Sequence, residues 1–188
     1  SFSNMLILFL GIEILSICLY VLAGSRKSDL ASNEASLKYF LLGAFATGFL
    51  LFGMTLIYGA TGSFNIQKIY SYFLENAAAP STLAVAGALL MLIAMAFKVS
   101  AVPFHFWAPD VYQGSPTVVT AFMSTVVKTA AFAAMFRLFQ DAFQSISGVW
   151  ENTIWVIVVA TILLGNITAV YQTNFKRMLA YSSIAHAG

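Results

Sequence analysis

Long apolar runs make up most of the chain, and polar residues are largely confined to the short stretches between them. A helix that crosses a bilayer needs about 20 mostly apolar residues. Five runs are long enough, at residues 2–23, 39–60, 80–113, 117–139 and 150–172, and the start of another follows at 175–188. The pattern therefore predicts an all-α fold, a multi-span transmembrane helical bundle.

The third run contains a proline, Pro103, at a position expected to lie within the membrane. Proline lacks an N–H donor, its ring clashes with the carbonyl four residues earlier, and it disfavours helical backbone in the preceding residue. We therefore expect one discontinuous helix, with a break near residues 99–103. Freed backbone groups in a membrane need partners from protein or water. The simpler alternative is an ordinary proline kink, with Lys98 reaching a nearby carbonyl.

Short polar segments connect the runs. One of them, "NIQKIYSYFLE", has the apolar spacing of a short surface helix. With five spans, the first and last connections share one side of the membrane. That side carries most of the basic residues, namely Arg26, Lys27, Lys38, Lys176 and Arg177. Only Lys68 and Arg137 lie on the other side. Because cytoplasmic connections are enriched in Lys and Arg, we expect the first side to be cytoplasmic.

Composition narrows the class of protein further. Hydrophobic residues make up 60% of the chain and charged residues 9%, against about 25% charged in a soluble domain. The net charge of +2 gives no support for nucleic-acid binding. The single cysteine, Cys18, argues against a cysteine-based metal or iron–sulfur site. The chain opens on apolar sequence without an initiator Met and stops early in a helical pattern, so we expect a fragment of a longer protein.

Three ionisable residues lie inside the apolar runs: Glu13, Lys98 and Lys128. An ionisable group near the bilayer centre costs about 2.5 to 3.5 kcal/mol on insertion scales, and such groups usually serve function. We expect Glu13 and Lys98 to face each other across a helix interface. The alternative is a buried Glu–Lys pair that only holds helices together.

Two further residues are candidates for proton transfer. His105 lies just beyond the expected break, between two phenylalanines, and histidine titrates near neutral pH. It is a candidate relay, or else a hydrogen-bonded core residue. Lys38 directly precedes the second run. It is either an ordinary flanking charge or an additional proton relay.

Four stretches, "LGIEILSICLYVL", "FKVSAVPFHFWAPDVYQGSPT", "VVKTAAF" and "NFKRMLAYSSIAHAG", carry a resemblance to a known family. They resemble the antiporter-like membrane-arm subunits of respiratory complex I, and look most like its N-type members. By position, Glu13, Lys98, Lys128 and His105 match the family's proton-relay residues, and Lys38 matches a lysine that opens a helix. The resemblance covers essentially the whole chain, residues 1–188, as part of a single transmembrane proton-translocating domain.

The resemblance implies a division of labour. This chain would be a translocase subunit of a proton-translocating NADH:quinone oxidoreductase, with no redox centre, cofactor or metal of its own. NAD, FMN, iron–sulfur clusters and quinone would lie in or at partner subunits. The partners would be other membrane-arm subunits, the lipid bilayer and protons, in a bacterial plasma (inner) membrane. Two alternatives stay open: a cation/proton antiporter subunit of the same fold, and a membrane scaffold with locked ion pairs.

Overall fold

The computed structural model describes residues 2–188, and every regular element in that range is helical. The α-helices are α1 (Met5–Ala23), α2 (Leu30–Thr61), α3 (Ile66–Glu75), α4 (Thr82–Val99), α5 (Ala108–Gly114), α6 (Thr117–Phe122), α7 (Lys128–Arg137), α8 (Ser147–Val170) and α9 (Phe175–Ala187). Two π-helical segments, η1 (Met123–Val127) and η2 (Leu138–Ala142), and one 3₁₀ turn, η3 (Gln144–Ile146), complete the chain. The expected all-α bundle is confirmed.

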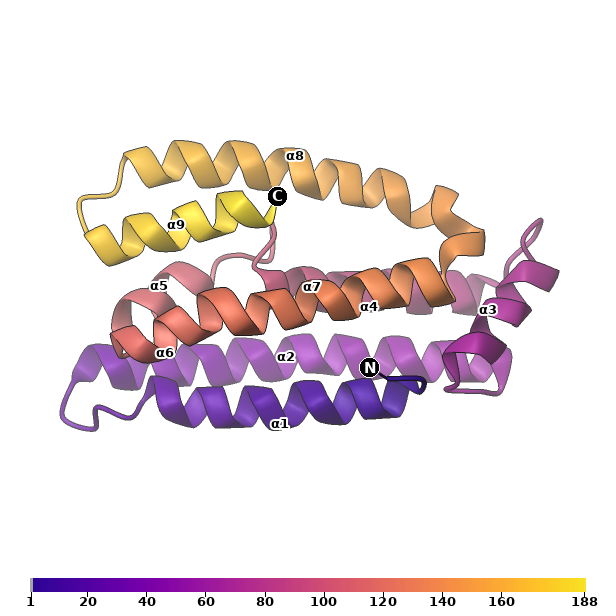
Figure 1. Ribbon diagram of the computed structural model, residues 1–188, viewed down its shortest axis with the longest axis horizontal. Helices are drawn as coiled ribbons and strands as arrows, with labels where there is room; N and C mark the ends of the chain where they lie inside the picture. Colours follow the sequence, from indigo (N-terminus) through magenta and orange to yellow (C-terminus); the bar gives the residue numbers. More distant parts are fainter. Residues whose placement is uncertain (1) are drawn as a thin grey trace.

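The long helices run side by side along the molecule (Figure 1). By length and apolar character, five of the described segments could cross a membrane: Met5–Ala23, Leu30–Thr61, Thr82–Val99, Thr117–Ala142 and Gln144–Val170. Many large apolar side chains on their outer faces are exposed, among them Val21, Phe45 and Val156. Because lipid rather than water meets such faces in a bilayer, the exposed apolar surface fits a membrane protein.

The second long helix begins earlier than its apolar run. The run starts at residue 39, whereas α2 starts at Leu30 after the N-cap Asp29, whose side chain accepts a hydrogen bond from the Ala31 N–H. A capping carboxylate and the mixed polar residues that follow it support a helix without being apolar. Hydropathy detects only the apolar part of a helix. The polar first turns of α2 are therefore not included in the predicted run.

The expected break is confirmed. The first half of the broken helix, α4, ends at Val99, and the second half, α5, begins at Ala108. Ser100 adopts left-handed backbone with φ of 61°, which closes the helix end. The short helix α3 also lies where the sequence predicts it, with Ile66, Ile69 and Phe73 buried.

The buried side chains form two main clusters. One lies toward α3 and η2 and includes Met54, Phe73 and Phe143. The other surrounds the break and includes Tyr39 and Trp107, whose rings are stacked with centroids 4.8 Å apart. The second cluster fixes the surroundings of the interrupted helix.

Candidate functional site

The backbone groups released by the break find partners within the protein. The Phe97 carbonyl accepts hydrogen bonds from the Ser100 N–H and from the Trp107 Nε1–H, both at 3.0 Å. The Val102 N–H donates to Thr161 Oγ1 on α8 at 2.9 Å. Such pairing is what a break at membrane depth requires. Thr161 was not identified from the sequence, since one threonine in an apolar run carries no distinctive signal.

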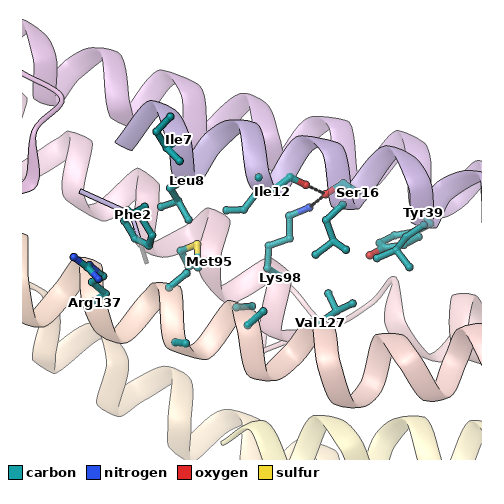
Figure 2. Close-up of a pocket in the computed structure, with 17 residues that line it drawn as sticks. Phe2, Ile7, Leu8, Ile12, Ser16, Tyr39, Met95, Lys98, Val127 and Arg137 are labelled. Carbon is teal, nitrogen blue, oxygen red and sulfur yellow. Dashed lines mark hydrogen bonds between the residues drawn. The ribbon is translucent and has the colours of Figure 1, made fainter. Parts of the chain in front are cut away.

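Lys98 occupies the last turn of α4, next to the break. Its Nζ donates a hydrogen bond to Ser16 Oγ on α1 at 2.7 Å, and Ser16 Oγ donates to the Ile12 carbonyl at 2.5 Å. Figure 2 shows both bonds, with the lysine side chain pointing from α4 toward α1. The carbonyl end of a helix favours a cation, and Lys98 is the basic residue in the last turn of α4.

Glu13 lies on α1, three residues before Ser16, and so points to the same side of the helix. Within residues 2–188, however, the ion pairs do not include one between Glu13 and Lys98. The direct partner of the Lys98 ammonium is instead the Ser16 hydroxyl, at 2.7 Å. Ser16 is a residue that the sequence reasoning missed.

Lys98 also lines a cavity of about 560 Å³ between α1, α4 and the helix that contains η1 and α7. Most of its walls are apolar, with Leu8, Met95 and Val127 among them. An ammonium group beside such a wall has few alternatives to the Ser16 hydroxyl as a partner.

Lys128 is the first residue of α7 and directly follows the π-helical segment η1. It is buried, and its Nζ donates to the carbonyl and the hydroxyl of Ser183 at 2.6 and 2.9 Å. It lines a second cavity, of about 530 Å³, together with Tyr112 and His186. His186 carries no distinctive signal in the sequence, and the structure places it in the same cavity as Lys128.

Different faces of one helix line the two cavities. Val127 lines the first and Lys128 the second, and both belong to the continuous segment Thr117–Ala142. Short π-helical stretches often occur at functional sites, because the extra residue in the turn reorients neighbouring side chains. Here the π-turn ends immediately before the lysine.

His105 lies in the turn between α4 and α5 and is partly exposed. Its Nδ1 atom is buried and has no hydrogen-bond partner among the residues described. The side-chain hydrogen bonds of that part of the chain join Lys98 and Lys128 to serines, and none of them joins His105 to either lysine.

Lys38 lies in the first third of α2, and α2 begins at the end of the bundle where the α8–α9 connection also lies (Figure 1). Its Nζ pairs with Asp110 of α5 at 2.7 Å and with Glu34 at 2.6 Å. Asp110 also accepts a hydrogen bond from Arg177 of α9 at 2.5 Å. The structure therefore brings Lys38 into an ion cluster rather than beside Lys98 or Lys128.

No group of three or more His, Cys, Asp and Glu side chains suited to a metal ion occurs in the 2–188 range. The polar groups that the site brings together are instead two amines, their serine partners and a nearby carboxylate. Together with the interrupted helix, they define a class of polytopic helical membrane proteins with ionisable groups in the bundle interior.

Comparison with known families identifies that class. The family described as "NADH:quinone oxidoreductase/Mrp antiporter, TM" matches residues 3–188, and the chain belongs to this family. It is 53% identical over 186 residues to the NADH-quinone oxidoreductase subunit N of Trichlorobacter lovleyi, and 56% identical over 188 residues to that of Cytophaga hutchinsonii. These alignments cover 99% and 100% of this chain, but 38% and 40% of the relatives.

Solved structures of related membrane complexes contain the same fold. A chain of respiratory complex I from Thermus thermophilus matches with a TM-score of 0.83 and 42% identity, over 100% of this chain and 39% of that chain. A chain of the Mrp complex from Dietzia matches with a TM-score of 0.86 and 27% identity, over 98% of this chain and 34% of that chain. The chain thus spans about two fifths of the length of the relatives it matches.

Proposed function

We propose that the chain is part of a proton-translocating membrane subunit of an NADH:quinone oxidoreductase, spanning a bacterial plasma membrane several times. The proposal assigns proton relay to Glu13, Lys98, Lys128 and His105, coupled to electron transfer in other subunits. The observation that carries it is the placement of two amines within the bundle, each bound by serine oxygens and each lining its own cavity.

The chemistry rests on the balance between the charged and neutral forms of an amine. Burial disfavours an ammonium ion, and a nearby carboxylate favours it. Glu13 lies one turn from the serine that binds Lys98, so its charge stabilises the Lys98 ammonium. When Glu13 is neutralised or moves away, Lys98 releases its proton toward Lys128. We place His105, beyond the break, as a further proton-exchanging group because imidazole titrates near neutral pH.

The proposal places the redox chemistry elsewhere. NAD, FMN, iron–sulfur clusters and quinone belong to, or bind at, partner subunits, and this chain acts as a translocase without a redox centre. Its partners are the other membrane-arm subunits and the lipid bilayer. Support comes from the names of the relatives, which are subunits of NADH-quinone oxidoreductases.

Replacing Lys98 with arginine tests the relay, because a guanidinium keeps its charge but does not release its proton in proteins. Lys98→Arg should preserve assembly and quinone reduction while abolishing most proton uptake, and Lys128→Ala should interrupt the path at its second amine. The measurement is proton uptake by vesicles containing the full complex, alongside quinone reduction in the same preparation. Lys68→Arg, at an exposed position of α3, is the matched control. A normal proton-to-electron ratio in Lys98→Arg would refute the relay.

A second candidate is a subunit of a cation/proton antiporter, favoured by the match to the Mrp complex chain. The same site would then exchange protons for another cation without electron transfer. Vesicles containing the full complex separate the two functions: NADH oxidation drives proton uptake in the first, whereas an imposed sodium gradient does so in the second.

A further inference from the structure

The second half of the broken helix, α5, is short and contains one ionised residue, Asp110. Its two carboxylate oxygens have different partners from different helices: Oδ2 accepts from Lys38 Nζ of α2 at 2.7 Å, and Oδ1 accepts from Arg177 Nη1 of α9 at 2.5 Å. One carboxylate therefore joins α5 to both neighbours.

Further contacts place the end of α5 against the same two helices. Gln113 Oε1 accepts from Arg177 Nη1 at 3.2 Å, and the Ser115 carbonyl accepts from Lys176 Nζ at 2.8 Å. On the other side, a Cβ atom at Gly114 would collide with the backbone carbonyl of Ala31 on α2. The position of α5 is thus fixed by ionic contacts with both α2 and α9 and, on the α2 side, also by close backbone approach.

The residues of α5 and the turn before it contact the surroundings of both buried lysines. Trp107 donates to the Phe97 carbonyl, directly before Lys98, at 3.0 Å. Tyr112 lines the cavity of Lys128, and its carbonyl accepts from Thr120 Oγ1 at 3.0 Å. A shift of α5 would therefore alter both lysine sites together.

We propose that Asp110, with Lys38 and Arg177, forms an ion cluster that positions α5 and thereby sets the arrangement of the two lysine sites for proton transfer between them. In this cluster Lys38 is a fixed counter-ion and Asp110 a positioning residue; neither carries the transferred proton. This inference rests on the proposed function and assigns a role to residues outside the relay itself.

The charges around Lys38 explain why it is fixed. Its ammonium group lies 2.7 Å from Asp110 and 2.6 Å from Glu34, and two carboxylates stabilise the protonated amine. The carboxylate of Asp110 is stabilised in turn by two cations. The Lys38, Asp110 and Arg177 side chains are still 33 to 40% exposed, so the pairs are screened by solvent. The cluster therefore acts mainly through position rather than through a large contribution to stability.

Substitution of Lys38 separates a counter-ion from a proton carrier. Lys38→Arg keeps the charge and the pairing but cannot release a proton, so it should retain the proton-to-electron ratio of the assembled complex. Lys38→Met and Asp110→Asn should lower that ratio, because α5 loses one or both of its ionic contacts. Glu34→Gln, which removes only the more exposed partner of Lys38, is the matched control with an unchanged ratio.

Hydrogen exchange of the α5 amides in the full complex gives a readout that does not depend on pumping. The amides of Val111 and Ser115 donate within this helix. Their exchange should be faster in Asp110→Asn and Lys38→Met by about two- to fivefold, as expected for the loss of an ion pair of this exposure. Lys38→Met removes only one of the two cations that contact Asp110. It therefore provides the same test if the Asp110→Asn complex does not assemble.

The outcomes distinguish this inference from the proposed function. A ratio in Lys38→Arg as low as in Lys38→Met would show that Lys38 releases protons and would overturn the inference. Unchanged ratios and exchange in Asp110→Asn and Lys38→Met would overturn it as well. If Lys98→Arg pumps normally, the relay fails, and the exchange measurement still decides whether Asp110 positions α5.

Discussion

At the scale of single residues, the buried amines are bound by hydroxyl groups. The sequence identifies Lys98, Lys128 and Glu13 because a charge inside an apolar run is conspicuous. It does not identify Ser16 or Ser183, because serines are common in membrane helices and only the hydrogen bonds of Lys98 to α1 and of Lys128 to α9 distinguish these two. The sequence also suggests Glu13 as the direct partner of Lys98, whereas the structure places Ser16 there.

Removal of the Ser16 hydroxyl should weaken the Lys98 site. In Ser16→Ala the ammonium loses an acceptor at 2.7 Å, and the loss of a hydrogen bond to a charged group costs about 1.5 to 3 kcal/mol. We expect the rate of coupled proton uptake in vesicles to fall roughly tenfold or more, since 1.4 kcal/mol corresponds to a factor of ten. Ser71→Ala, which removes an exposed hydroxyl on α3, should leave the rate unchanged. An equal rate in the two variants would exclude Ser16 from the site.

At the scale of helices, hydropathy and proline chemistry predict much of the architecture. The break is predictable because the effect of Pro103 on backbone geometry is local. The polar start of α2 and the π-turn before Lys128 are not predictable in this way. A π-turn depends on how neighbouring helices pack around it, and the segment Met123–Val127 contains neither glycine nor proline to indicate it.

The crossing of α2 and α4 depends on two facing glycines. A Cβ atom at Gly53 would lie 2.8 Å from the Gly87 carbonyl oxygen, and one at Gly87 would lie 2.8 Å from the Gly53 carbonyl oxygen. Small residues allow membrane helices to approach this closely. The close approach brings α4, which carries Lys98, against the longest helix of the bundle.

Gly53→Ala should therefore destabilise the bundle by about 1 to 3 kcal/mol, the usual cost of inserting atoms into a packed interior. The measurement is the thermal unfolding midpoint of the purified complex. Gly48→Ala, in the same helix, is the matched control because no atom lies within 4 Å of its added Cβ. Its midpoint should stay the same or rise, since alanine favours helix over glycine. Equal midpoints for the two variants would show that the glycine contact is not needed.

At the scale of the whole molecule, the two ends of the bundle differ in charge. The α1–α2 and α8–α9 connections lie at the same end (Figure 1), as an even number of crossings between them requires. That end contains five basic residues, Arg26, Lys27, Lys38, Lys176 and Arg177, whereas Lys68 and Arg137 lie elsewhere. Three of the five, Lys38, Lys176 and Arg177, make contacts with α5 or the residue after it. Sequence counting alone gives the charge asymmetry, but only the fold shows that part of it surrounds the broken helix.

The charge asymmetry predicts the orientation of the bundle in the membrane. Because short connections rich in Lys and Arg remain in the cytoplasm, a cysteine introduced at Ser28, between α1 and α2, should be protected from a membrane-impermeant thiol reagent in intact cells. A cysteine at Ala78, between α3 and α4, should react. Both variants are made in a Cys18→Ser background, because Cys18 is exposed, and both should react once the membrane is permeabilised. Labelling of the Ser28 variant but not of the Ala78 variant in intact cells would contradict this orientation. It would place the Asp110 cluster on the outer side of the membrane.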